Sequence, residues 1–405
     1  MTSPLPAPAP HNATRRSGWR VAVVTETYPP EVNGVAVTIA RIVDGLRTQG
    51  HRVQVIRPRQ TRDITHPSDD WLMRGLPIPR YSELRMGLPA TGELLRRWRE
   101  QRPDVVHLVT EGPLGWSALR AARQLNLPVV SDFRTNFHAY TQHYGISWLR
   151  GPIVAYLRHL HNRTACTMVP TAALQQELAG MGFERLHVVA RGVDAGRFRP
   201  DLRSADLRRE WGADDDNTPV VLCVGRLAPE KNLEAVVAAW RAMTEIKPGT
   251  KLVLVGDGPD RARLAALVPE ATFMGTQRGE ALARCYASAD VFAFASLTET
   301  FGNVVPEAMA SGLAVLAYQH AAAGQLIQHG HNGLLAPPGD QADFLRLARE
   351  LASKPAWARR LGQQALETAR ALDWQHIIEG IEAQYLAAMS PSTQPASSLR
   401  PARVG

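Results

Sequence analysis

The 405-residue sequence contains few cysteines and no long apolar run, and each shortage excludes a class of protein. Its three cysteines, Cys166, Cys223 and Cys285, lie far apart among apolar neighbours, which is typical of buried free thiols in a reducing compartment and not of a zinc site. No apolar run approaches the roughly 18 residues that a membrane-spanning helix needs. Residues 1–18 and 390–405 are rich in Pro, Ala and Ser and have no signal-peptide core, so we expect two disordered tails on a cytoplasmic protein.

Lysine is also scarce, because the chain has only four lysines against 42 arginines. The charge is uneven: Trp19 to Pro200 holds 24 arginines, no lysine and 15 acidic residues, whereas the rest from Asp201 holds 20 basic and 23 acidic residues. A basic half can face nucleic acid, anionic lipid or an anionic substrate, and it can also be the solvated surface of an arginine-rich protein. Charge alone does not decide between these readings.

Short β-branched runs alternate with helical stretches, which predicts βα units on parallel sheets. Continuously apolar runs such as Val-Ala-Val-Val are typical of strands that are covered on both faces. We expect six strands in each half, at 20–26, 52–58, 104–110, 128–133, 166–169 and 186–190, and then at 219–225, 251–256, 271–274, 290–295, 314–317 and 333–336. This predicts an α/β protein with two Rossmann-like, doubly wound domains at 19–198 and 199–372, followed by a C-terminal helix at 373–389 that packs back on the first domain.

Ligands of such sheets bind beyond the carboxyl ends of the strands, so the loops there are the place to search. The first loop, residues 25–35, lacks the G-x-G-x-x-G pattern of nicotinamide and flavin sites. It is instead rich in proline and opens a helix at Gly34, where backbone N–H groups can approach an anion. Gly34 can equally be simple loop-to-helix punctuation.

The loop after the first strand of the second half reads Gly-Arg-Leu-Ala-Pro-Glu-Lys-Asn over residues 225–232. It places Arg226 and Lys231 five positions apart, with the lysine at the opening of the next helix. A forked guanidinium and a compact ammonium together suit a diphosphate. The alternative is solvated surface charge, which the scarcity of lysine in this chain disfavours.

The segment 296–312 follows the strand at 290–295 and opens a helix at about Gly302. Glu299 lies just before this helix and Glu307 eight positions later, inside it. The backbone N–H groups of Gly302, Asn303 and Val304 suit a diphosphate or a sugar hydroxyl. Two shorter turns, 191–194 and 256–259, end other strands and are interpreted as structural.

These second-half motifs, with Gly-Leu-Leu at 333–335, resemble the family-4 retaining glycosyltransferases, over nearly the whole chain from about Arg20 to Leu386. The resemblance implies the GT-B fold, in which two Rossmann-like domains face each other across a cleft. It also implies a metal-independent enzyme that moves a hexose from a nucleotide-sugar donor. The best expectation is mannose from GDP-mannose, with a UDP-hexose as the other donor; no cofactor and no metal are expected.

The resemblance also implies roles for individual residues. Arg226 and Lys231 would hold the donor diphosphate, Gly34 would cover it from the other domain, and Glu307 would bind the ribose. Glu299 would contact the transferred sugar, assisted by the backbone at Phe301, Gly302, Asn303 and Val304.

One position departs from the family pattern. Where the family places a histidine beside the sugar, in a sequence such as Phe-His-Thr, this chain has Arg134 in Phe-Arg-Thr. Arg134 can contact a phosphate or a hydroxyl but cannot act as a base. His138, four residues later, can replace the histidine in part or be a structural histidine.

The acceptor is less defined by the sequence. Arginines and apolar residues alternate at helical spacing in 94–99 and 146–160, which is typical either of helices packed on a sheet or of helices in an anionic membrane interface. Relatives of the Thr-Asn-Phe-His type resemble glycolipid and phosphatidylinositol mannosyltransferases, which implies a lipid acceptor in preference to a soluble glycan, at the inner face of the membrane. Two alternatives stay open: a GT-B epimerase or phosphorylase, and a sugar-nucleotide-binding protein without catalysis.

Overall fold

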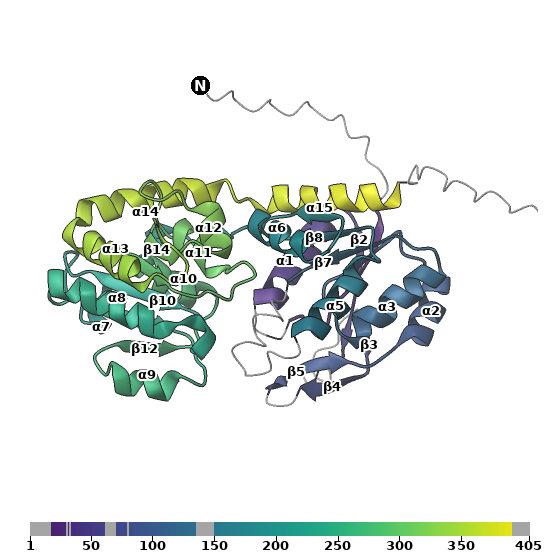
Figure 1. The fold of residues 1–405 in the computed structure, drawn as a ribbon, viewed down its shortest axis with the longest axis horizontal. Helices are drawn as coiled ribbons and strands as arrows, with labels where there is room; N and C mark the ends of the chain where they lie inside the picture. The colour runs from purple at the N-terminus through teal and green to yellow at the C-terminus, as the bar shows by residue number, and fades with distance from the viewer. Residues whose placement is uncertain are drawn as a thin grey trace, which may run out of the picture.

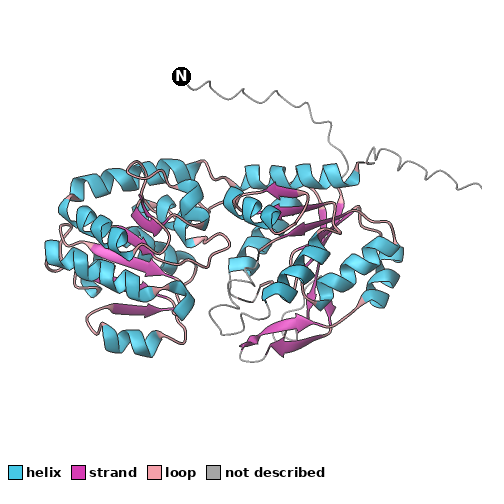
Figure 2. Cartoon of the chain, in the orientation of Figure 1, coloured by secondary structure: helices cyan, strands magenta, loops and turns pink. Residues whose placement is uncertain are grey.

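The computed structural model describes residues 18–29, 31, 34–60, 70–78, 81–134 and 150–390. Within them the chain forms two lobes, each built on a parallel sheet, and a long C-terminal helix that runs along the first lobe (Figure 1). Helices cover both faces of each sheet (Figure 2). The expected doubly wound α/β architecture is therefore present in both halves.

The first sheet has seven parallel strands in the order β3-β2-β1-β6-β7-β8-β9. Their bounds are β1 Arg20–Val24, β2 Arg52–Pro58, β3 Trp71–Met73, β6 Val105–Leu108, β7 Val129–Asp132, β8 Cys166–Val169 and β9 Leu186–Val188. On the central strand, Val21 lies beside Val53 of β2 and Val105 of β6. A two-stranded antiparallel hairpin, β4 Gly75–Ile78 and β5 Tyr81–Gly87, stands apart from this sheet.

Two apolar cores lie on the two faces of the first sheet. The helices are α1 Gly34–Thr48, α2 Thr91–Glu100, α3 Pro113–Gln124, α5 Arg150–His161 and α6 Ala172–Gly180. Trp98 of α2 and Leu119 of α3 pack on one face, and Ile39 and Val43 of α1 pack on the other. Fully buried side chains on both faces explain why the strands read as unbroken apolar runs.

The second sheet has six parallel strands in the order β12-β11-β10-β13-β14-β15. They are β10 Val220–Val224, β11 Lys251–Val255, β12 Thr272–Gly275, β13 Val291–Phe294, β14 Ala314–Tyr318 and β15 Leu334–Ala336. The helices and 3-10 turns are η3 Pro200–Leu202, α7 Ala205–Glu210, η4 Pro229–Lys231, α8 Leu233–Ile246, α9 Arg261–Leu267, α10 Gly279–Ser288, α11 Val304–Ala310, α12 Ala321–Leu326, α13 Gln341–Ser353 and α14 Pro355–Arg370. Because β10 lies beside β13, the loops that follow these two strands open at the same edge.

All twelve expected strands are present, with ends that differ by at most two residues. The expectation of six strands in the first sheet was wrong by one, because β3 is an edge strand of only three residues, too short to be recognised from its apolar pattern. The β4–β5 hairpin was also missed. α11 begins at Val304 and not at Gly302, because Gly302 has a φ of +87°, a left-handed conformation that cannot belong to the helix.

The last helix, α15, spans Trp374–Met389 and lies along the first lobe (Figure 1). Its Ile378, Ile381 and Tyr385 are buried against α1 and the first sheet. Contact with α1 is so close that a side chain at Gly45 would come within 2.6 Å of Ile378. The second lobe is thereby tethered to the first by two chain crossings, one before β10 and one at the start of α15.

The three cysteines are free and buried, as the sequence predicted. Burial raises the pKa of the Cys166 and Cys223 thiols to about 12, so these side chains stay protonated and act as small apolar groups. Within the described ranges, no helix is both long enough and apolar enough to pass through a bilayer.

Candidate active site

The loop after β10 carries the two cations that the sequence singled out. Leu227 N donates to the Asp257 carbonyl oxygen and Asp260 N donates to the Leu227 carbonyl oxygen, both at 2.9 Å, so the turn after β11 supports this loop. A side chain at Gly256 would come within 1.9 Å of the Gly225 carbonyl oxygen, and only glycine fits there. The 256–259 turn therefore has the structural role that its sequence suggested, which is to hold the Arg226 loop in place.

Arg226 and Lys231 are each paired with a carboxylate from the same edge of the sheet. Arg226 donates to Glu230, and Lys231 Nζ donates to Glu299 Oε1. Thr298 Oγ1 donates to the Glu230 carbonyl oxygen at 3.1 Å and joins the two loops. Lys231 and Glu299 are 68 positions apart, and strand order alone brings them together. Both cations keep part of their surface exposed, 34% for the Arg226 side chain and 17% for that of Lys231, so a ligand can reach them.

The Glu299 loop leads directly into α11. Phe301 is 2% exposed and anchors the loop in the core of the second domain. The His320 imidazole hydrogen-bonds to the Glu299 carbonyl oxygen at 3.2 Å and fixes its backbone. The structure thus gathers Arg226, Lys231, Glu299 and the backbone from Phe301 to Val304 into one cluster at the carboxyl edge of the second sheet.

Glu307 lies one turn into α11 and faces α10. The Tyr286 hydroxyl donates to Glu307 Oε2 at 2.9 Å. Burial raises the pKa of the Glu307 carboxyl to about 7, although the Tyr286 hydrogen bond and the charge of Arg197 act in the opposite direction. A carboxyl group in this state can either donate or accept a hydrogen bond near neutral pH, which suits a pair of ribose hydroxyls.

Gly34 approaches the second domain through Asn303, the residue just before α11. Asn303 Nδ2 lies 3.5 Å from the Gly34 carbonyl oxygen and 3.2 Å from Thr38 Oγ1, both on the first turn of α1. A side chain at Gly34 would lie 3.7 Å from that same amide. The first turn of α1 therefore faces the Glu299 loop across the domain junction.

Arg134 lies at the end of β7 in a buried ion pair. Its Nε donates to Asp132 Oδ2 at 2.6 Å, and His107 Nε2 reaches the same oxygen at 2.9 Å. Burial alone raises the pKa of Asp132, but Arg134 and His107 outweigh it and hold the pKa at about 2. The Tyr385 hydroxyl of α15 hydrogen-bonds to His107 Nδ1 at 2.7 Å, so the C-terminal helix reaches this network. His138 lies outside the described residues.

Arg191 is a residue that sequence reasoning missed, because the turn 191–194 was interpreted as structural. Its side chain is 6% exposed and lies at the domain junction, where Nη1 donates to Asn303 Oδ1 at 3.3 Å. The guanidinium lies over the Phe301 ring, 5.3 Å from its centre. The sequence contains one indication of a special role for Arg191, which is its position directly before a glycine in the connection between the domains. This pattern does not show that the Arg191 side chain is buried.

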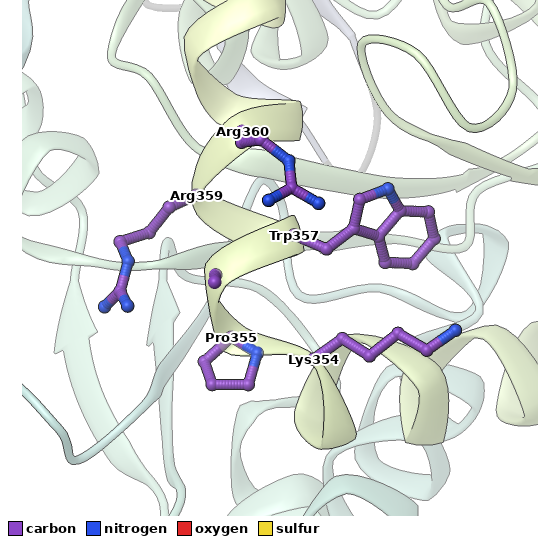
Figure 3. A pocket seen from close by; sticks show the side chains of 6 residues that line it. Lys354, Pro355, Trp357, Arg359 and Arg360 are labelled. Carbon is purple, nitrogen blue, oxygen red and sulfur yellow. The ribbon is translucent and has the colours of Figure 1, made fainter.

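A phosphorylase would need a cofactor lysine late in the chain, and Lys354, the last of the four lysines, is the candidate. Figure 3 shows Lys354 at the start of α14, with its side chain extending on the same side of the helix as Trp357. It is 57% exposed and pairs with Glu350. Its position gives no support to the phosphorylase alternative.

The state of Glu307 predicts a pH dependence of stability. The folded pKa of Glu307 lies above the ordinary glutamate value of 4.5, so this contribution is complete below pH 4.5 and is lost as the pH rises through about 7. Between pH 5 and 8, we expect the unfolding free energy of the wild type to fall by roughly 2 kcal/mol more than that of Glu307→Gln, which has no carboxyl group to titrate. Urea unfolding across this range measures it, with the exposed Glu280→Gln on α10 as the control that follows the wild type. Identical pH profiles for Glu307→Gln and wild type would contradict the assignment.

Comparison with known protein families matches both halves of the chain. A model described as Glycosyltransferase Family 4 matches residues 32–197, and one described as Glycosyl transferases group 1 matches residues 218–354. The match to both halves agrees with the motifs found at the carboxyl edge of the second sheet.

Individual relatives extend over most of the chain. GDP-mannose-dependent alpha-mannosyltransferases of Mycobacterium tuberculosis and Mycolicibacterium smegmatis are 40% and 36% identical, covering 80% and 91% of this chain and 85% and 98% of their own. The alpha-monoglucosyldiacylglycerol synthase of Streptococcus pneumoniae is 27% identical over 78% of this chain and 75% of its own. Sucrose-phosphate synthase from Thermosynechococcus elongatus, at 22% identity, covers 92% of this chain and all of its own with a TM-score of 0.76. This likeness confirms the expected GT-B fold class.

Proposed function

Because the chain belongs to glycosyltransferase family 4, we propose that this retaining glycosyltransferase transfers mannose from GDP-mannose to a lipid acceptor. The observation that carries the proposal is the cluster in which Lys231 pairs with Glu299 beside the Arg226–Glu230 pair. The donor is taken from relatives at 40% and 36% identity that are named for GDP-mannose. A UDP-hexose is the competing donor.

We assign different parts of the nucleotide-sugar donor to the residues of the cluster. Arg226 and Lys231 hold the diphosphate, Glu299 and the backbone at 301–304 hold the sugar, and Glu307 holds the ribose. Gly34 lies above the diphosphate from the first domain. These roles are compatible with one another, because Arg226, Lys231, Glu299 and the backbone at 301–304 lie at one edge of the second sheet, and Asn303 contacts Gly34 from there.

In the transfer, the bond between the anomeric carbon and the diphosphate oxygen breaks as the acceptor oxygen bonds to the same face of the carbon. The acceptor proton passes to the departing phosphate oxygen, and negative charge accumulates on that leaving group. Positioned cations stabilise such charge by several kcal/mol, about 3 for one donor. Arg226 and Lys231 therefore supply what a magnesium ion supplies in other transferases. Within the described part of the chain, no three His, Cys, Asp or Glu side chains gather in a way that could hold a metal ion.

Transfer from radiolabelled GDP-mannose to vesicles that contain a diacylglycerol glycolipid tests the function. We expect label in the organic phase, in a linkage that α-mannosidase cleaves, and an unchanged rate in excess EDTA. Faster transfer from UDP-glucose would show that the donor is a UDP-hexose and not GDP-mannose. Loss of activity in EDTA that magnesium restores would contradict metal independence. Saturable binding of GDP-mannose without any transfer would favour the binding protein over the enzyme.

The lipid acceptor is supported by the surface of the first domain. Leu76 and Met86 face each other across the β4–β5 hairpin and are 53% and 40% exposed. Arg74, next to them, is exposed as well, and the whole half carries the surplus of arginine. An apolar pair with basic neighbours is suited to the interface of an anionic membrane. One relative is named for a diacylglycerol product, which agrees with this acceptor class. A lipid acceptor of this kind would place the protein at the inner face of the membrane.

Membrane contact predicts salt-dependent flotation. With phosphatidylglycerol vesicles, we expect binding at low salt that weakens as salt rises, because the screening length falls below 10 Å or so. Leu76→Ser with Met86→Ser should lower binding about tenfold, since two partly inserted apolar side chains are lost. Ile246→Ser with Leu267→Ser, at 46% and 39% exposure on the second domain, is the matched control and should bind like the wild type. Equal loss in both double variants would contradict the assignment to the hairpin.

A further inference from the structure

Arg191 is a buried arginine with unused hydrogen-bond donors. Its Nη1 donates to Asn303 Oδ1, whereas Nε and Nη2 are buried and have no hydrogen-bond partner among the described residues. Burying a donor without a partner costs about 1–3 kcal/mol, and more when the group is charged. A donor left in this state requires an explanation.

Other buried arginines of the chain show what a structural role looks like. Arg208, 2% exposed, donates to the carbonyl oxygens of Ser288, Asp215 and Thr218 and pairs with Asp290. Arg134 is paired with Asp132. Arg191 is buried to a similar degree but has no carboxylate partner among the described residues, and it gains only one hydrogen bond and the face of Phe301.

The surroundings of Arg191 favour an anion. Burial and the nearby charge of Arg134 lower the pKa of Arg191 to about 9, while Asp132 and Glu299 act in the opposite direction. Glu299 is also the partner of Lys231, so Arg191 and Lys231 lie near the same carboxylate. Through Asn303, Arg191 is linked to Gly34 and Thr38 on α1. The unused donors therefore lie where the two domains and the Glu299 loop meet.

We propose that Arg191 binds an anionic oxygen of a substrate at the domain junction, and that this oxygen belongs to the diphosphate of the nucleotide-sugar donor. Nε and Nη2 of a guanidinium present parallel donors that match two oxygens of one phosphate. Arg191 is then a third cation of the donor site, supplied by the interdomain connection. This inference rests on the proposed function for the existence of a nucleotide-sugar donor. The other source of such an oxygen is an acidic acceptor headgroup.

Calorimetric titration of the full chain with GDP, and with guanosine as the ligand that lacks phosphate, tests the inference. For Arg191→Met we expect at least a tenfold weaker affinity for GDP and an unchanged affinity for guanosine, with Arg191→Lys in between. Arg199→Met is the matched control, because Arg199 lies eight positions along the same connection, is 52% exposed and pairs with the exposed Asp201 at 3.5 Å. It should bind both ligands like the wild type.

Unfolding free energy distinguishes ligand binding from a structural role. Replacing a buried, incompletely paired charge by an apolar side chain of similar length is often neutral or stabilising. We therefore expect Arg191→Met to be at least as stable as the wild type in urea while it binds GDP more weakly. Equal GDP affinity for Arg191→Met and wild type would overturn the inference.

Two further outcomes distinguish an error in the donor assignment from a failure of the proposed function. If GDP affinity is unchanged and Arg191→Met raises KM for an acidic lipid acceptor but not for a neutral one, the anionic oxygen belongs to the acceptor and the donor assignment is overturned. If the wild type binds neither GDP nor UDP, the proposed function fails. Arg226→Met distinguishes a failure of the Arg191 assignment from a failure of the proposed function, because it should weaken GDP binding even if Arg191→Met does not.

Discussion

Replacing Lys231 by alanine should raise the dissociation constant for GDP at least thirtyfold and lower kcat by roughly 100- to 1000-fold. The side chain of Lys231 lies at the carboxyl edge of β10, pairs with Glu299 and is 17% exposed. A charge-assisted bond to a phosphate contributes about 1.5–3 kcal/mol to binding, and more in the transition state, where the leaving diphosphate gains charge. Removal of the lysine also leaves the Glu299 carboxylate unpaired beside that diphosphate, which adds repulsion to the lost attraction.

Titration calorimetry with GDP and initial rates with labelled GDP-mannose measure the two effects. Lys354→Ala is the matched control, because it removes a lysine of the same domain that is exposed and paired with Glu350 at the start of α14. The control should change neither quantity. Lys231→Ala with the affinity and rate of the wild type would exclude Lys231 from the donor site.

The cluster of Arg226, Lys231 and Glu299 in the second domain could be predicted because each of its loops follows a strongly apolar strand. Val220–Val224 and Val291–Phe294 are buried along their whole length, and such runs are recognised from sequence alone. Once both are strands of one parallel sheet, the loops after them meet at one edge, and the contact between Lys231 and Glu299 follows from strand order. The start of α11 was misplaced by two residues, because the conformation of Gly302 is set by the loop that it closes.

The first domain was less predictable for two physical reasons. β3 has only three residues, and β4 and β5 lie outside the main sheet, so no long apolar run marks them as strands. The state of Arg134 and Arg191 depends on residues that are distant in sequence: Asp132 and His107 for the first, and Asn303 and Phe301 for the second. A motif identifies an arginine, but only the packed structure shows whether its donors are used.

Asp132→Ala should destabilise the protein by about 3–5 kcal/mol, because it removes one partner of a buried ion pair. Asp132 is 3% exposed and accepts from Arg134 and from the His107 ring at one oxygen. Without this carboxylate, Arg134 is left 9% exposed with no ion-pair partner among the described residues, and it is close enough to Arg191 for the two positive charges to repel. Urea unfolding at pH 7.5, followed by circular dichroism and tryptophan fluorescence, measures the loss.

The double variant Asp132→Ala with Arg134→Met should recover most of this stability, since the pair is then replaced by apolar groups and neither of its two charges is left buried. Glu367→Ala is the control: its ion pair with Arg370 is about 60% exposed on both sides and should contribute less than about 1 kcal/mol. If the double variant is as unstable as Asp132→Ala, the cost comes from lost packing and not from the stranded arginine.

The same ion pair predicts how the unfolding free energy falls in acid. The folded pKa of Asp132 is about 2, held there by Arg134 and His107 against the effect of burial, and it lies below the ordinary aspartate value of 3.8. A lowered carboxyl pKa contributes stability that is present above the unfolded value and is lost as the pH falls through the folded one. Between pH 4 and pH 2, the wild type should therefore lose about 2 kcal/mol more than the double variant, which lacks the carboxylate. Parallel acid titrations of the two proteins would contradict the strength of this pair.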